Sequence, residues 1–268
     1  MNNIFDIKRF VNYFAYDLRR AGSSYGISLL VLGLMPVILL VLHMLGSLFS
    51  SGSTSAVSDQ AKFTVFCVVV FVTAVSAGVK IYGSVTDKRA GSDFLMLPAS
   101  TAEKWLSLSL MVCIVVPAAL LALTLGSDAL LSWLFPAAYG NGAIAGFCGD
   151  ALNFTGNDDF YINIPAILFL GWCGCTLTFT LGGLLFKKAK VAKTFLCLFA
   201  IGTVLSLLAV LVVGSLDVQP EQLGRLEDSF NDPEVAIRTL NWIANISNFI
   251  TLGGLLALIW LRLRTIKH

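Results

Sequence analysis

The chain has 268 residues, of which 57% are hydrophobic and 13% are charged, and its mean hydropathy is +0.83. An ordinary soluble domain carries about 25% charged residues, and a compact domain of this length could not bury so much apolar surface. The composition excludes a soluble globular enzyme, a disordered chain and a nucleic-acid-binding protein. It predicts an all-α polytopic membrane protein.

The first element expected along the chain is an amphipathic helix over residues 4–20. Apolar side chains recur there at spacings of three and four residues: Ile7, Phe10, Val11, Phe14 and Leu18. Such a helix lies in the membrane interface and leads into the first span. It either only anchors the chain or also touches a cytoplasmic partner, and the two roles are compatible. The polar residues around it do not fit a cleavable signal peptide.

Six runs are long and apolar enough to cross a bilayer, since a helix needs about 20 residues to span the hydrocarbon. We therefore predict a single six-helix transmembrane domain. Pro36 and Pro117 lie inside the first and third runs and predict kinks. The runs are residues 27–49, 63–85, 105–125, 162–186, 194–216 and 242–261.

The charges alternate with these six spans. Fifteen of the 18 Lys and Arg residues fall on the side that holds both termini, while 11 of the 16 acids fall on the other. The net charge of +2 is therefore the sum of +10 on one side and −8 on the other. Because positive residues favour the cytoplasmic side, both termini are expected in the cytoplasm.

The cytoplasmic connection between the second and third spans, residues 86–104, is too long for a minimal turn. It holds a charged stretch at 87–89 and an apolar stretch at 94–97, which needs a partner surface or the headgroup region. An ordinary interfacial elbow is the alternative. Ser100 and Glu103 form a capping-box pattern, which predicts a helix that continues into the third span.

Polar residues also mark the start of the sixth span. Asp232 and Pro233 predict the start of a helix, as a cap followed by proline at its first position. Asn241, Asn245 and Asn248 lie on one face of this helix. They either line a polar passage or hydrogen-bond to neighbouring helices.

The sequence shows no pattern for catalysis or metal binding. It has no glycine-rich loop ending in Gly-Lys-Ser/Thr, no cluster with metal-ligand spacing, and no Asp or Glu within the six predicted spans. Proton-coupled carriers keep acids within their spans, so this type of transport is not favoured. We expect no enzymatic activity, no catalytic residue, no metal and no cofactor in this chain.

The six spans, the amphipathic N-terminal helix and the 86–104 segment resemble the permease subunit of type-2 ABC transporters, in a form similar to small permeases of Bacteroidetes-type bacteria. The resemblance implies an exporter of the bacterial inner membrane, built as a dimer of permease chains among membrane lipids. An ABC-type nucleotide-binding subunit would bind ATP and Mg²⁺. The residues it implies for ATPase coupling are Asp87, Lys88, Arg89, Leu95, Leu97, Pro98, Ser100, Glu103 and Lys104.

Two other classes of function fit the same topology. One is a non-transporting membrane scaffold or regulatory protein, and the other is an ATP-independent carrier or channel. The family's re-entrant outer helix would fall on residues 222–241, which are charged here rather than apolar. The substrate stays open among lipids, peptides, drugs and polysaccharides.

Overall fold

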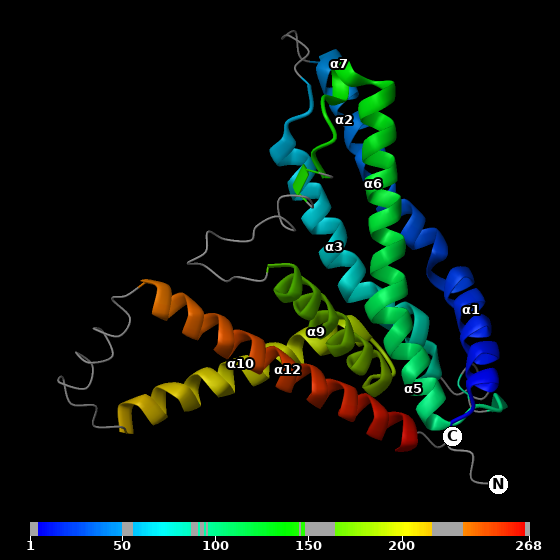
Figure 1. Ribbon diagram of the computed structural model, residues 1–268, viewed down its shortest axis with the longest axis vertical. Coiled ribbons are helices and arrows are strands. Elements are labelled where there is room, and N and C mark those ends of the chain that lie inside the picture. Colours follow the sequence, from blue (N-terminus) through cyan, green and yellow to red (C-terminus); the bar gives the residue numbers. More distant parts are fainter. Residues whose placement is uncertain are drawn as a thin grey trace.

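The computed structural model describes residues 5–49, 56–86, 91, 94, 96–144, 146–147, 164–215 and 233–265, and every regular element in these ranges is helical (Figure 1). This agrees with the predicted all-α class. A 3-10 turn, η1 (Gly83–Thr86), follows α3, and a π-helical turn, η2 (Met111–Val115), joins α5 to α6. The α-helices are α1 (Ile7–Gly33), α2 (Met35–Phe49), α3 (Asp59–Tyr82), α5 (Thr101–Leu110), α6 (Val116–Leu134), α7 (Pro136–Tyr139), α9 (Ile164–Leu185), α10 (Lys190–Ser215) and α12 (Pro233–Thr265).

Several of these helices are long and apolar enough to cross a membrane. Five qualify on their own in the described part of the chain, and the bent pair α1–α2 makes a sixth if it counts as one span. The predicted runs coincide with α3, the continuous α5–η2–α6 helix, α9, α10 and α12. The structure therefore agrees with a polytopic membrane protein.

The N-terminal helix and the first predicted span are not separate elements. The helix expected over 4–20 continues to Gly33, and the chain then bends by 42° into α2. Proline has no N–H to donate, so Pro36 cannot continue the hydrogen-bond ladder of α1, and the kink expected there is observed. Gly33 also lets α6 approach, because a Cβ at this position would lie 2.5 Å from Leu123 Cβ.

The third predicted span is one helix of 34 residues, Thr101–Leu134. Its one irregular stretch is η2, where the Val116 N–H donates to the Met111 carbonyl five residues earlier. Pro117 comes directly after this turn and has no N–H for the ladder, so the wider π turn absorbs the interruption. The helix also contains residues 128–134, which lie beyond the end of the predicted span at residue 125.

The helices converge at one end of the molecule, at the lower right of Figure 1, and diverge at the other. We call this the convergent end, and three hydrogen bonds from basic side chains define it. Arg20 Nη2 donates to Ser84 Oγ at 2.8 Å, Lys190 Nζ to the Gly83 carbonyl at 2.6 Å, and Arg262 Nε to the Leu184 carbonyl at 3.1 Å. They link the middle of α1 and the start of α10 to η1, and the end of α12 to the end of α9.

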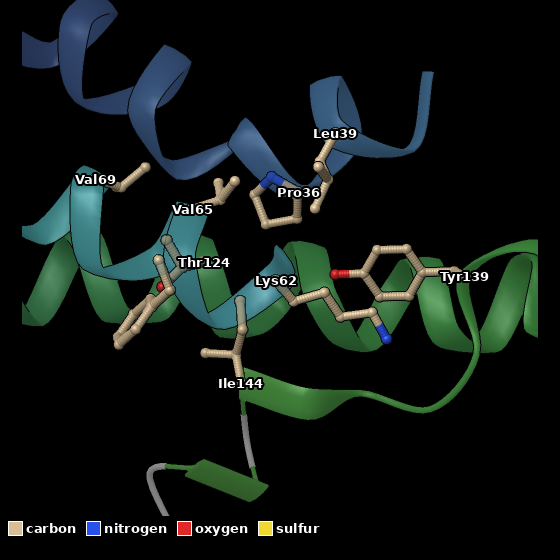
Figure 2. A pocket seen from close by; sticks show the side chains of 9 residues that line it. Pro36, Leu39, Lys62, Val65, Val69, Thr124, Tyr139 and Ile144 are labelled. Carbon is tan, nitrogen blue, oxygen red and sulfur yellow. The ribbon is translucent and has the colours of Figure 1, made fainter. Parts of the chain in front are cut away.

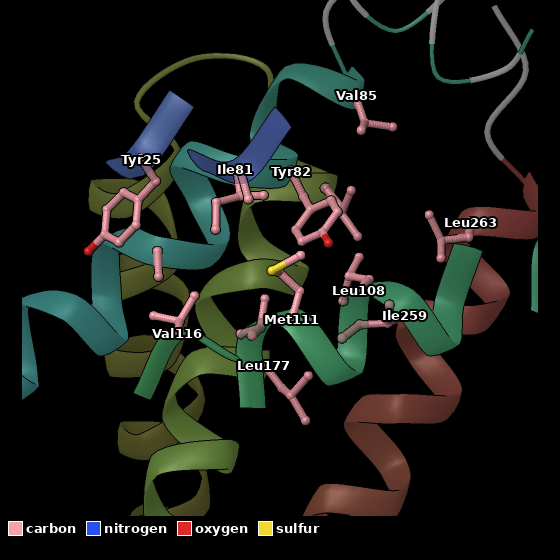
Figure 3. Packing of buried hydrophobic residues seen from close by; sticks show 14 of the residues in the cluster. Tyr25, Ile81, Tyr82, Val85, Leu108, Met111, Val116, Leu177, Ile259 and Leu263 are labelled. Atoms are coloured by element: carbon pink, nitrogen blue, oxygen red, sulfur yellow. The ribbon is translucent and has the colours of Figure 1, made fainter. Parts of the chain in front are cut away.

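The main hydrophobic core fills the space between these converging helices. α9 packs against α3, α10 and α12, and the buried side chains come from both sides of it. Close approach depends on Gly78 and Gly182, whose added Cβ atoms would overlap Thr180 and Thr194. Figure 3 shows part of this core, with Tyr25, Ile81, Tyr82, Val85, Leu108, Met111, Val116, Leu177, Ile259 and Leu263 labelled.

α10 is attached to the rest of the molecule mainly at its first turns. Thr194 is buried against α9, whereas every described side chain from Phe195 to Leu211 is exposed. These exposed residues are almost all apolar and occupy every side of the helix. A helix that is apolar all round is typical of a membrane span.

Candidate functional site

A groove of about 440 Å³ opens at the convergent end, between the first turns of α1 and the segment that precedes α5. We call it the α1–α5 groove. Its walls combine charged, polar and apolar groups, as a surface for a protein partner does. It is lined by Asp6, Lys8, Arg9, Asn12, Tyr13 and Tyr16 from the N-terminal side and by Leu97, Pro98 and Ala99 from the other.

The two walls of the groove are joined by the carboxylate of Glu103, whose side chain is fully buried. Arg9 donates to it from Nε at 2.9 and 3.0 Å and from Nη2 at 2.7 Å. The backbone N–H of Asp6 donates to the same carboxylate at 3.0 Å, and that of Ser100 at 2.8 Å. Charge-assisted bonds of this kind are about twice as strong as neutral ones. Glu103 therefore fixes the start of α1 to the start of α5.

Ser100 completes the capping box predicted from the sequence. Its Oγ accepts the Glu103 N–H at 3.2 Å, while Glu103 accepts the Ser100 N–H, so both free donors at the helix start are satisfied. α5 begins at Thr101, directly after this cap.

Lys104 fixes the segment before α5 at a second point. Its side chain is 8% exposed, and Nζ donates to the Phe94 carbonyl at 2.7 Å, with the ammonium 4.8 Å from the Phe94 ring centroid. Phe94 itself is buried in the main core. Met96, two residues later, is 81% exposed. The segment is thus anchored on both sides of a protruding apolar residue.

The structure sorts the residues implied for ATPase coupling into two groups. Leu97 and Pro98 line the α1–α5 groove. The other three residues, Ser100, Glu103 and Lys104, make the hydrogen bonds that hold its walls in place. A coupling role for the buried pair Glu103 and Lys104 would therefore act through the residues they hold. The remaining members of the set, Asp87, Lys88, Arg89 and Leu95, lie outside the described residues.

Sequence reasoning did not find the N-terminal half of the groove. The sequence marks Arg9 and Asp6 only as polar residues of an interfacial helix, and it does not single out Tyr16. The ion pair between Arg9 and Glu103 joins residues 94 positions apart, and no local pattern marks it. The one usable signal in the sequence is the excess of basic residues on the predicted cytoplasmic side.

The asparagines of the sixth span lie on α12, as predicted. Asn245 and Asn248 are half-buried, and the side chain of Asn241 lies outside the described residues. Their role as a polar passage or as packing contacts stays a prediction.

A second cluster of buried polar groups lies at the divergent end of the molecule (Figure 2). Lys62 is 1% exposed, and its Nζ donates to Asp59 Oδ1 at 3.0 Å and to the Asn141 carbonyl at 2.8 Å. The ammonium also lies 4.4 Å from the ring centroid of Tyr139. The adjoining cavity measures about 10 Å³, which is room for one water molecule at most.

Tyr139 connects this cluster to α6. Its hydroxyl donates to Asp128 Oδ1 at 2.6 Å, and the other oxygen of Asp128 accepts the Ile144 N–H at 3.2 Å. Burial, together with this hydrogen bond, raises the pKa of the Tyr139 phenol, so the hydroxyl stays a donor. The cluster fixes α7 to α3 and α6, and its small cavity fits a packing role.

Among the described residues, no group of three or more His, Cys, Asp or Glu side chains is arranged to hold a metal ion. Comparison of the chain with protein-family models, with curated proteins and with solved structures finds no match. The candidate site is therefore defined by its own geometry.

Proposed function

We propose that this chain is the membrane permease subunit of an ATP-driven exporter, and that a separately encoded ABC-type ATPase docks on the α1–α5 groove. The observation that carries the proposal is the Glu103 carboxylate, which joins the start of α1 to the segment before α5. The exposed side chain of Met96 and the groove residue Leu97 offer an apolar contact beside the charged groups of α1.

This arrangement suits the transmission of force from a partner. Arg9 and Ser100 are held on one carboxylate, and Lys104 holds the segment at Phe94, so displacement of the groove moves α1 and α5 together. In the proposed assembly two permease chains enclose the path, and the ATPase binds ATP and Mg²⁺. The convergent end faces the cytoplasm of a bacterium, with both termini on that side of the inner membrane.

Co-purification tests the docking. The tagged chain, expressed in its own host and extracted in mild detergent, should recover an ATPase that contains a Gly-Lys-Ser/Thr phosphate loop. Met96→Gln should lower that recovery several-fold, because it places a polar amide in an apolar contact. Met44→Gln, on an exposed methionine of α2 at the divergent end, is the matched control and should leave recovery unchanged.

Two results would contradict the proposal. The first is a chain that purifies repeatedly without an ATPase and transports in liposomes without ATP, as an independent carrier or channel does. The second is stable recovery of other partners with no ATPase among them, as for a membrane scaffold.

A further inference from the structure

Asp17 is a buried acid at the meeting point of three helices of the convergent end. Its side chain on α1 is 1% exposed. Oδ2 accepts the Tyr82 hydroxyl of α3 at 2.5 Å and the Ser107 hydroxyl of α5 at 2.7 Å. Tyr82 is itself part of the buried core shown in Figure 3. One carboxylate oxygen is thus fully satisfied by two neutral donors.

Two oxygen atoms at this junction have no hydrogen-bond partner among the residues that the structure describes. They are the second carboxylate oxygen of Asp17, Oδ1, and the hydroxyl of Tyr13, and both are buried. Tyr13 precedes Asp17 by four residues, so the two side chains lie on the same face of α1, one turn apart. A buried polar atom without a partner destabilises the fold, and more so when it is charged. Two such atoms on one helix face therefore indicate a ligand.

The cationic side chains nearby are already engaged elsewhere. Arg20, one turn further along α1, donates to Ser84, and Arg9, one turn before Tyr13, is paired with Glu103. No ion pair to Asp17 is formed within the described part of the chain. A buried carboxylate is retained when a cation or a strong donor compensates it. The charge of Arg20 acts on the junction from a distance, but among the described residues no cationic group contacts Asp17 Oδ1.

The oxygens at this junction determine the chemical class of the ligand. The set comprises one carboxylate and the hydroxyls of Tyr13, Tyr82 and Ser107, all of them hard oxygen donors. Hard cations prefer oxygen ligands, and divalent ions usually take more than one carboxylate or keep several waters. A single negative charge balances a single positive one. We propose that Asp17 Oδ1 and the Tyr13 hydroxyl bind a small monovalent cation, of the alkali-metal class, which compensates Asp17 and joins α1 to α3 and α5.

This inference does not depend on the proposed transport function, because the site lies within one chain and needs no ATPase. The purified full chain in detergent is titrated with NaCl and with KCl, and choline chloride keeps the ionic strength constant. At least one alkali cation should raise the apparent melting temperature in a saturable manner. At a tenfold excess over the dissociation constant, the rise should be roughly 3–6 °C.

Two variants locate the effect. Tyr13→Phe removes only the unpartnered hydroxyl and leaves the two donors to Asp17 Oδ2 in place, so the chain should fold and bind the cation at least several-fold more weakly. Asp17→Asn should abolish the titration. Ser23→Ala, which removes an exposed hydroxyl of the same helix outside the groove, should keep the wild-type response.

A second measurement covers the case in which Asp17→Asn fails to fold. Binding of ²²Na⁺ to the wild-type chain and to Tyr13→Phe is compared in a scintillation proximity assay, with unlabelled NaCl and KCl as competitors. The site is supported if unlabelled NaCl or KCl competes less effectively with ²²Na⁺ for binding to Tyr13→Phe than for binding to the wild-type chain. A wild-type chain that responds to neither cation overturns the inference, since a buried water then satisfies the two oxygens. A response unchanged in Tyr13→Phe also overturns it.

Discussion

Gly78 on α3 lies directly against Thr180 on α9. A Cβ added to Gly78 would overlap the Thr180 hydroxyl and lie 2.8 Å from its Cβ. We predict that Gly78→Ala lowers stability by roughly 1–3 kcal/mol, the usual cost of overpacking. Thermal unfolding in detergent measures this, with Gly171→Ala as the control, because nothing lies within 4 Å of that position. If the double variant Gly78→Ala/Thr180→Gly recovers stability relative to Gly78→Ala, the contact is confirmed. If Gly78→Ala and Gly171→Ala are equally stable, the contact is contradicted.

Removal of the Arg9 side chain should separate α1 from α5. Arg9→Ala leaves the buried Glu103 carboxylate with only the backbone N–H groups of Asp6 and Ser100. Loss of its charged partner should destabilise the buried carboxylate and lower the melting temperature. Since the Arg9 side chain is 38% exposed, solvent screens the ion pair and the decrease should be small. Lys8→Ala, at the neighbouring exposed position, should have little effect on the melting temperature. If Arg9→Ala and Lys8→Ala lower the melting temperature by the same amount, the ion pair between Arg9 and Glu103 contributes nothing specific.

The hydroxyl of Tyr139 should stabilise the divergent end. Tyr139→Phe keeps the ring beside Lys62 and removes only the donor to Asp128 Oδ1, which is buried. The unpaired carboxylate oxygen should cost about 1–3 kcal/mol. The double variant Asp128→Asn/Tyr139→Phe should lose less unfolding free energy than the sum of the losses in the two single variants, because the two residues share one contact. Strict additivity of the unfolding free energies would refute the coupling.

The sorting of charges predicts which side of the membrane each end occupies. With the six cysteines replaced, Lys187→Cys should react with an impermeant maleimide only after the membrane is permeabilised. Trp133→Cys, near the C-terminal end of α6, should react in intact cells from which the outer membrane has been removed. The reverse pattern would place the convergent end outside and would contradict the proposed docking of a cytoplasmic ATPase.

Local patterns predicted much of this fold. The lengths of the apolar runs predicted the helices that form α3, α9, α10 and α12, since each run is a single uninterrupted helix. The capping box at Ser100 and the helix start at Pro233 were also predicted correctly. Both signals depend on residues within one turn of each other, so no knowledge of distant contacts is needed.

The packing of α1 could not be predicted in this way. Its conspicuous apolar residues Ile7, Val11 and Leu18 are exposed, as they would be against lipid, while Tyr13 and Asp17 face the protein. The buried face depends on distant partners such as Tyr82 and Ser107, which no local pattern indicates. For the same reason, Lys62 and Asp128 enter the sequence analysis only as charges on the side opposite the termini. A count of charges by segment does not show that such groups are buried.

The attachment of α10 at one end has a mechanical consequence. Lys190 and Thr194 hold its first turn, and Phe195 contacts Phe179 with ring centroids 4.8 Å apart. From Leu196 to Ser215 the helix extends about 29 Å, at about 1.5 Å per residue. A rotation of about 10° at its base would therefore carry the far tip through about 5 Å. Small displacements of the turn beside Gly83 therefore become larger ones at the far end of α10.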